Sequence, residues 1–155
     1  MRIVVAADSA GVELKHDLRE QLRADSRVTE VIDVGVADCD DDRPYPLLGL
    51  AAAETIARGE ADRGVLVCGT GIGVAIAANK VHGVRATVAH DSYSAERAVK
   101  SNSCQVITFG ARVIGPELAK KIVTEWLGHT FDTNSPSATK IAHITDYENS
   151  STTSR

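Results

Sequence analysis

A cysteine followed by three glycines at alternate positions is the part of this chain best suited to chemistry. Residues 65–80 read VLVCGTGIGVAIAANK. The apolar run predicts a buried parallel strand that delivers Cys68 to the carboxyl edge of a sheet, and the alanine-rich segment after Gly73 predicts a helix. The first N–H groups of a helix have no partner within it, and glycines let an anion approach them closely. A thiol beside such a cradle could act as a base or nucleophile next to a stabilised oxyanion.

Two other interpretations of this segment remain open from the residues alone. Cys68 could be a small core residue, as many cysteines at the end of apolar strands are. The glycines could also belong to a dinucleotide-binding fingerprint. That pattern needs a glycine at position 76, which is Ile76 here, and no acidic residue ends the next expected strand.

Polar residues end three further expected strands, and each has two interpretations. Asp8 could cap the following helix or bind a substrate hydroxyl. His90 could act on a substrate, while its neighbour Asp91 could cap the next helix. Arg112 could be a solvated surface residue or an anion ligand.

Composition indicates one globular domain and excludes several classes of function. The 155 residues are 43% hydrophobic and 25% charged, with a formal net charge of -4, which argues against nucleic acid or an anionic membrane as partner. Three widely spaced cysteines and scattered histidines predict neither a disulfide framework nor a metal site. No apolar run approaches the ~20 residues of a membrane span, and the first residues read as a strand rather than a leader, so we expect a cytoplasmic protein. The domain is expected over 1–149, with a disordered Ser/Thr tail over 150–155.

Apolar runs alternate with amphipathic stretches along the whole chain. Continuously apolar strands that alternate with helices predict a parallel sheet covered on both faces, in a Rossmann-like three-layer α/β sandwich. Ligands bind such sheets at the carboxyl edge. Strands are expected at 2–7, 28–34, 63–68, 84–89 and 104–109, and helices at 11–24, 47–58, 73–81, 92–100, after Gly115-Pro116, and from about 135–137 onward.

Several motifs together resemble one enzyme family. They are DSAG at 8–11, CGTGIG at 68–73, HDSYSA at 90–95, SN at 101–102 and GARVIG at 110–115. In type, order and spacing they resemble the family of ribose-5-phosphate isomerase B and galactose-6-phosphate isomerase, over nearly the whole domain. The DSAG, SN and RVIG forms are similar to its D-erythrulose-4-phosphate isomerase branch. The resemblance implies a small phosphorylated sugar as substrate and isomerisation through a cis-enediolate without metal or cofactor.

The resemblance also implies roles for individual residues. Cys68 would be the base that moves a proton between C1 and C2, and Thr70 would assist proton transfer at the oxygens. Backbone N–H groups, together with Asn102, would hold the oxyanion, and Arg112 would face the phosphate. Family members are homodimers or pairs of dimers, so Tyr45 and the C-terminal helix would reach the neighbouring subunit. The expected substrate-binding residues are Asp8, Ser9, Tyr45, Gly69, Gly71, Ile72, Gly73, His90, Asn102, Arg112, Ser137 and Lys140.

The chain departs from the pentose-phosphate members of the family in ways that favour a shorter sugar. Ser9 and Ser101 stand where those members carry histidines, the second of which opens the furanose ring. The paired arginines of the last helix are missing too, which leaves Ser137 and Lys140 in that region. A four-carbon sugar 4-phosphate has its O4 esterified and cannot close a five-membered ring. It therefore needs no ring-opening group, and its phosphate lies one carbon nearer the reacting end.

Three alternatives to an erythrulose-4-phosphate isomerase stay open. A ribose-5-phosphate isomerase could open the ring with another group, such as His90. A non-catalytic phosphosugar-binding module could keep the fold without the reaction. A nucleotide-binding domain would instead bind NAD or ATP.

Overall fold

Strands and helices alternate along the chain as the sequence predicts. The computed structural model describes the backbone of residues 1–152, with the side chains of 1–150. The strands are β1 (Arg2–Ala7), β2 (Glu30–Asp33), β3 (Arg63–Cys68), β4 (Ala86–Val88) and β5 (Val106–Gly110). The helices are α1 (Val12–Ala24), α2 (Tyr45–Ala57), α3 (Ile72–Ala78), α4 (Ser92–Lys100), α5 (Pro116–Leu127) and α6 (Pro136–Thr152).

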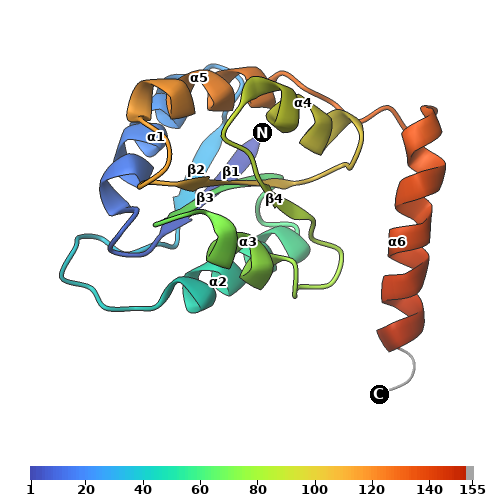
Figure 1. The fold of residues 1–155 in the computed structure, drawn as a ribbon, viewed down its shortest axis with the longest axis horizontal. Coiled ribbons are helices and arrows are strands. Elements are labelled where there is room, and N and C mark those ends of the chain that lie inside the picture. Colours follow the sequence, from blue (N-terminus) through green and yellow to red (C-terminus); the bar gives the residue numbers. More distant parts are fainter. Residues whose placement is uncertain (153–155) are drawn as a thin grey trace.

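The strands of the described residues form one parallel five-stranded sheet in the order β2-β1-β3-β5-β4. Helices α1, α4 and α5 cover one face and α2 and α3 the other, which makes the expected three layers (Figure 1). After β1 the chain passes to α1 on one face, whereas after the neighbouring β3 it passes to α3 on the opposite face. Loops that diverge in this way leave an opening at the carboxyl edge of the sheet.

Both faces of the central strands are buried, which explains why their sequences are continuously apolar. In β3, Val65 and Val67 pack into the layer of α1, α4 and α5. Leu66 and Cys68 point the other way, into the layer of α2 and α3. The alternation of side chains along β3 therefore places the Cys68 side chain on the face of the sheet that α3 covers. The loop from Cys68 to Gly73 leads to that helix.

The two outer strands are shorter than the sequence predicts. Residues 28–34 and 84–89 were expected as strands, but β2 covers only Glu30–Asp33 and β4 only Ala86–Val88. Each lies at an edge of the sheet and has one neighbouring strand to pair with. Apolar composition alone could not indicate where that pairing stops.

Helix α6 stands apart from the sheet and its helical layers (Figure 1). Ile141 is its buried residue, and near its end Asn149 and Glu148 hydrogen-bond to His82 and to the Gly83 N–H. The helix continues through Thr152 rather than ending at 149, and residues 153–155 of the expected tail lie outside the described residues. Within the described residues, none of the helices combines the length and apolar composition of a membrane crossing.

A buried lysine joins α1 to the segment that follows β2. The Lys15 ammonium, 1% exposed, donates to the Asp33 carboxylate at 2.9 Å and to the Val36 carbonyl at 2.6 Å. Burial raises the pKa of Asp33, but hydrogen bonds from Lys15, Arg19 and the Gly35 N–H outweigh this and hold the pKa below its ordinary value. The carboxylate therefore contributes stability near neutral pH that is lost as the pH falls through this lowered pKa.

Replacing this lysine should destabilise the fold. In Lys15→Met the Asp33 carboxylate and the Val36 carbonyl lose a charged donor inside the protein, so we expect a loss of about 2–3 kcal/mol in the free energy of unfolding. Urea unfolding followed by circular dichroism measures it. Lys121→Met is the matched control, because Lys121 is exposed and 3.9 Å from Glu125, and should change stability by less than about 0.5 kcal/mol. Equal effects of the two substitutions would contradict the assignment.

Candidate active site

A cavity of about 430 Å³ opens at the carboxyl edge of the sheet, where the loops after β1 and β3 diverge. Its lining brings together residues from four segments. These are Asp8 and Ala10 after β1, Tyr45 at the start of α2, Cys68, Gly69, Thr70, Ile72, Gly73 and Ile76 from β3 to α3, and Arg112 after β5. Most residues expected to act on a substrate therefore meet in one place.

The Cys68 thiol lies at the base of this cavity. Only 4% of the residue is exposed: it packs in the core layer of α2 and α3 and also lines the cavity. Its sulfur accepts a hydrogen bond from the Gly71 N–H at 3.1 Å. An N–H group directed at sulfur stabilises negative charge there, and the thiolate is the form that can take a proton or attack a carbon.

Glycine is required at position 71 by two independent constraints. Its φ of +78° is in the left-handed region, and a Cβ there would lie 2.8 Å from the backbone of Phe109. At Gly73 a Cβ would collide with the ring of Tyr45, so the absent side chain makes room for that ring. Tyr45 thus forms a wall of the cavity of its own chain, and its expected contact with a neighbouring subunit stays a prediction.

The end of β5 supports the Cys68 loop through several hydrogen bonds. The Ala111 and Arg112 N–H groups donate to the carbonyls of Cys68 and Gly69 at 2.9 and 3.0 Å. The buried Thr108 hydroxyl donates to the Gly71 carbonyl at 2.7 Å. Sequence reasoning missed Thr108, although a hydroxyl within the apolar run VITFG was a signal that a buried partner exists.

Asp8 and Arg112 lie on opposite loops at the cavity. An Asp8 carboxylate oxygen accepts the N–H groups of Ala10 and Gly11 at 3.1 and 3.2 Å, so it orders the turn before α1 while lining the cavity. Both interpretations of Asp8 are therefore compatible with its position. Arg112 is exposed, with its guanidinium over Gly69, where a fixed cation could meet an anion. Ser9 is exposed beside Asp8.

His90 is held by the backbone. Its Nε2 accepts the Gly110 N–H at 2.9 Å, and its ring lies 6.3 Å from that of Phe109. Burial lowers the pKa of His90, and the negative charge of Asp91 opposes that shift. The ring is therefore neutral at ordinary pH and uses one nitrogen to support the end of β5. The expected capping role of Asp91 is confirmed, since its carboxylate accepts the Ser94 N–H at 2.7 Å.

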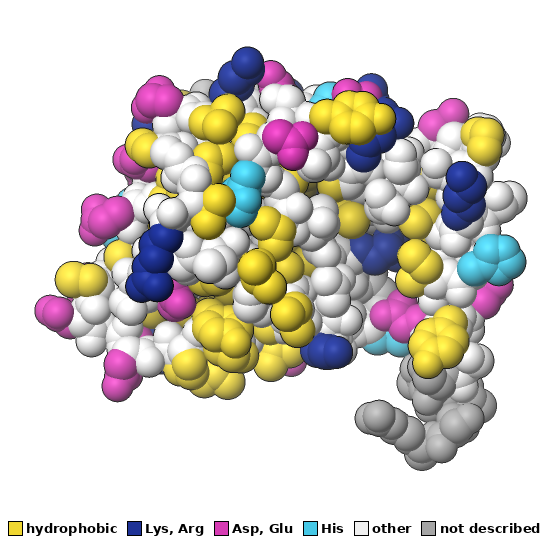
Figure 2. Space-filling view, viewed as in Figure 1, with side chains coloured by type: hydrophobic (Ala, Val, Ile, Leu, Met, Phe, Trp, Pro, Cys, Tyr) yellow, Lys and Arg dark blue, Asp and Glu magenta, His cyan; other side chains and the backbone are white. Residues whose placement is uncertain are grey.

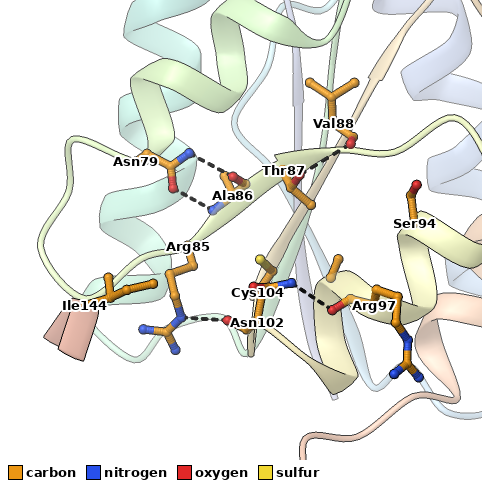
Figure 3. A pocket seen from close by; sticks show the side chains of 11 residues that line it. Asn79, Arg85, Ala86, Thr87, Val88, Ser94, Arg97, Asn102, Cys104 and Ile144 are labelled. Atoms are coloured by element: carbon orange, nitrogen blue, oxygen red, sulfur yellow. Dashed lines mark hydrogen bonds between the residues drawn. The ribbon is translucent and has the colours of Figure 1, made fainter. Parts of the chain in front are cut away.

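Asn102 does not meet Cys68 within one chain. It precedes β5 at the amino edge of the sheet, whereas Cys68 ends β3 at the carboxyl edge. There it lines a second cavity of about 530 Å³ beside β4, together with Arg85 and Arg97 (Figure 3). The Asn102 side-chain amide donates to the backbone carbonyl of Arg97 at 3.1 Å. The backbone carbonyl of Asn102 accepts a hydrogen bond from the Arg85 guanidinium, also at 3.1 Å.

The remaining residues expected to bind substrate lie on α6. Ser137 is half-buried and Lys140 exposed in the first turns of this helix, away from the lining of the Cys68 cavity. Over the described part of the chain, no group of three or more His, Cys, Asp or Glu side chains is arranged to hold a metal ion.

Comparisons with known proteins match the sequence and the fold of this chain to a family. The family described as Ribose/Galactose Isomerase matches residues 3–144. D-erythrulose-4-phosphate isomerase 2 of Mycolicibacterium smegmatis is 55% identical over 96% of this chain and 97% of its own. D-erythrulose-4-phosphate isomerase of Pectobacterium atrosepticum is 45% identical over 96% of this chain and 95% of its own. The structure of Clostridium thermocellum ribose-5-phosphate isomerase B superposes with a TM-score of 0.90 at 39% identity, over 97% of this chain and 99% of that one. The resemblance stated from the motifs is confirmed, and the chain belongs to the ribose/galactose isomerase family.

Proposed function

We propose that this protein is an aldose–ketose isomerase that converts D-erythrulose 4-phosphate to D-erythrose 4-phosphate through a cis-enediolate. The observation that carries the proposal is the Cys68 sulfur, which accepts the Gly71 N–H at the base of a cavity faced by Arg112. The relatives that are 55% and 45% identical bear the name of this activity and support the choice of substrate.

The reaction needs a base, a stabilised oxyanion and a proton carrier between two oxygens. The Cys68 thiolate removes a proton from C1 of the ketose, and negative charge develops on O2. Backbone N–H groups of Gly69, Thr70 and Gly73 stabilise that charge, while the Gly71 N–H stays on the Cys68 sulfur. The Thr70 hydroxyl carries a proton from O1 to O2, and the Cys68 thiol returns its proton to C2, which leaves the aldehyde at C1.

The remaining groups of the cavity orient the substrate. Asp8 accepts a hydrogen bond from a substrate hydroxyl, and Arg112 pairs with the phosphate. The serines at positions 9 and 101 supply no ring-opening base, which suits a four-carbon sugar that reacts as the open chain.

A second copy of the chain is part of this proposal. Asn102 cannot reach the Cys68 of its own chain, because the two residues lie at opposite edges of the sheet. Apolar side chains gather over α2 and α3, where Leu47, Ile72 and Ile76 are each more than half exposed (Figure 2). Since Ile72 and Ile76 also line the cavity, a neighbouring subunit seated there would bring its own residues to the substrate. We therefore propose a homodimer in which Asn102 and α6, with Ser137 and Lys140, complete the neighbour's site. Pairing of dimers and a cytoplasmic location remain predictions.

The substrate is tested by comparing kcat/KM for the two candidate sugars. We expect D-erythrulose 4-phosphate to exceed D-ribulose 5-phosphate by roughly 100-fold, because a phosphate displaced by one carbon misplaces C1 and C2 relative to Cys68. In deuterium oxide, NMR should detect solvent deuterium at C1 or C2. Turnover of the pentose phosphate alone would identify a ribose-5-phosphate isomerase. Absence of turnover and exchange with both sugars would contradict the isomerase proposal.

The base is tested by Cys68→Ala. Loss of a positioned base should lower kcat by about 10³-fold and leave KM within about threefold, as stopped-flow and steady-state assays would measure. Cys39→Ala is the matched control, because Cys39 is exposed on the loop before α2 and should be silent. A non-catalytic binding module would bind the sugar phosphate equally well before and after the substitution, with no turnover in either form.

The support of the loop is tested by Thr108→Val, which removes one hydroxyl without changing side-chain volume. Without its 2.7 Å anchor the Gly71 peptide is free to shift, so its N–H should stabilise the Cys68 thiolate less. We expect alkylation of Cys68 by iodoacetamide at pH 7.5 to slow by about fivefold, and kcat to fall by about as much.

Thr55→Val is the matched control for this substitution. The buried Thr55 hydroxyl donates to the Ala51 carbonyl at 2.8 Å within α2, so its loss also removes a buried hydrogen bond. This variant should lose stability and keep the alkylation rate of the parent. If both variants alkylate at the parent rate, Thr108 contributes only to stability.

A further inference from the structure

His90 occupies the position at which the ladder between β4 and β5 would continue. The two strands pair Ala86 with Val106 and Val88 with Thr108, so the next such pair would join His90 with Gly110. However, β4 ends at Val88, so the ladder does not continue to this pair. The imidazole Nε2 of His90 accepts it instead, at 2.9 Å.

Gly110 is the junction between β5 and the loops that form the cavity. A Cβ at this position would lie 2.6 Å from the backbone of Thr70, so the two segments are in direct contact. The residues after Gly110 hold the Cys68 loop through the Ala111 and Arg112 N–H groups. The Gly110 carbonyl also accepts the N–H groups of residues 113 and 114 and so shapes the turn that presents Arg112. A contact that orients the backbone of Gly110 therefore acts on the loop that carries Cys68 and on the turn that carries Arg112.

The hydrogen bond from Gly110 exists only while the imidazole is neutral. A backbone N–H can only donate, so Nε2 must be the unprotonated nitrogen and the ring hydrogen must lie on Nδ1. In the imidazolium form both nitrogens carry hydrogen, and Nε2 would point an N–H at the Gly110 N–H. Protonation of this one ring removes the acceptor and replaces attraction by repulsion.

The surroundings of the ring keep it neutral under ordinary conditions. From β5 the ring meets Phe109 and the Gly110 amide, neither of which titrates. The charged group that acts on it is the adjacent Asp91, whose carboxylate is engaged by the Ser94 N–H at the start of α4. Burial outweighs Asp91, and the pKa of His90 lies below its ordinary value. The ring is thus neutral at pH 7 and becomes protonated only in acid.

We propose that His90 is a positioning residue for the isomerase reaction and an acid-sensitive latch: its neutral ring holds the Gly110 peptide, and its protonation releases the Cys68 loop and Arg112. Its effect on turnover rests on the proposed function, whereas its effect on the Gly110 amide does not. This role needs no contact between His90 and the substrate. It differs from the substrate-binding and ring-opening roles expected from sequence, because Nε2 is already occupied.

The chemistry of the side chain allows a sharp substitution series. In His90→Gln the Oε1 oxygen can reach the place of Nε2 and accept the Gly110 N–H, but it does not titrate. His90→Asn is one methylene shorter and has no acceptor at that distance. His16→Gln removes a histidine from α1, away from the cavity, and serves as the control for loss of an unrelated imidazole.

The first measurement is hydrogen exchange of the Gly110 amide by NMR, expressed relative to its intrinsic rate. We expect protection at pH 7 in the parent, His90→Gln and His16→Gln, and exchange at least about tenfold faster in His90→Asn. In an acid titration that passes through the pKa of His90, as followed by its own ring resonances, the parent should lose protection once the ring is protonated and His90→Gln should keep it. Long-range ¹H–¹⁵N spectra of the parent should place the ring hydrogen on Nδ1 at pH 7. Equal protection in all four proteins throughout the titration would overturn the latch, and so would a ring hydrogen on Nε2.

The second measurement is kcat between pH 5 and 8 with D-erythrulose 4-phosphate. At pH 7.5, His90→Gln should retain at least a third of the parent kcat and His90→Asn less than a tenth. The ratio of parent kcat to His90→Gln kcat should fall by at least fivefold from pH 7.5 to an acid pH at which the His90 ring is protonated, because only the parent then loses its acceptor for the Gly110 N–H. The corresponding ratio for His16→Gln should stay constant.

Each contrary result points to a different explanation. If His90→Gln protects the Gly110 amide but is as inactive as His90→Asn, the ring contacts the substrate and the positioning role is wrong. If the kcat ratio does not change with pH, the acid-sensitive part of the proposal is wrong. If the parent turns over no sugar phosphate, the proposed function fails, while the amide measurement still decides whether the latch exists.

Discussion

The hydrogen bond from the Gly71 N–H to the Cys68 sulfur is the constraint on which the rest of the site depends. It requires a left-handed residue three positions after the end of β3, and only glycine fits there, since its φ is +78° and a side chain would strike Phe109. The loop cannot hold this shape alone, so β5 supports it through Thr108 and through the residues after Gly110. The reactive group is therefore positioned by a neighbouring strand rather than by its own helix, which has only seven residues.

The strand order explains why β5 can do this. Because β5 lies between β3 and β4, its carboxyl end is adjacent to the Cys68 loop on one side and to His90 on the other. The same order places the loop before β5, with Asn102, at the opposite edge of the sheet. One strand therefore supports the site of its own chain at one end and, on the proposed dimer, contributes to the site of the neighbour at the other. Packing of the sheet and completion of the site would then be coupled through β5.

Much of the fold and the centre of the site could be predicted from the sequence, for physical reasons. Continuous apolar runs such as 63–68 specify strands buried on both faces, and the glycine pattern after Cys68 specifies a backbone conformation that other residues avoid. The ends of β2 and β4 could not be predicted, because they depend on pairing at a sheet edge. Tyr45, Thr108 and His90 act through contacts with Gly73, Gly71 and Gly110, far from them in sequence, so only the folded chain reveals what they support. Asn102 was predicted by resemblance, and its place just before the strand expected at 104–109 already indicates the opposite edge of a parallel sheet from Cys68; only the folded chain shows its contacts with Arg85 and Arg97.

The groups proposed for the reaction lie on one loop and other residues of the expected site lie on separate segments. This arrangement has a consequence for how such a site can change its substrate. The groups proposed for proton transfer are the Cys68 thiol and the Thr70 hydroxyl, and those proposed to stabilise the oxyanion are N–H groups of the same loop. Substitutions on other segments leave all of these in place. Other residues of the expected site are side chains on separate segments, such as Ser9 after β1 and Ser137 and Lys140 on α6. A change from a five-carbon to a four-carbon substrate can therefore be made on those segments while the loop from Cys68 to Gly73 stays intact. The resemblance drawn from the sequence implies that the histidines and arginines of pentose-phosphate members serve a ring and a more distant phosphate. A chain proposed to act on a four-carbon sugar phosphate can therefore lack them and keep Cys68 and the glycines that follow it.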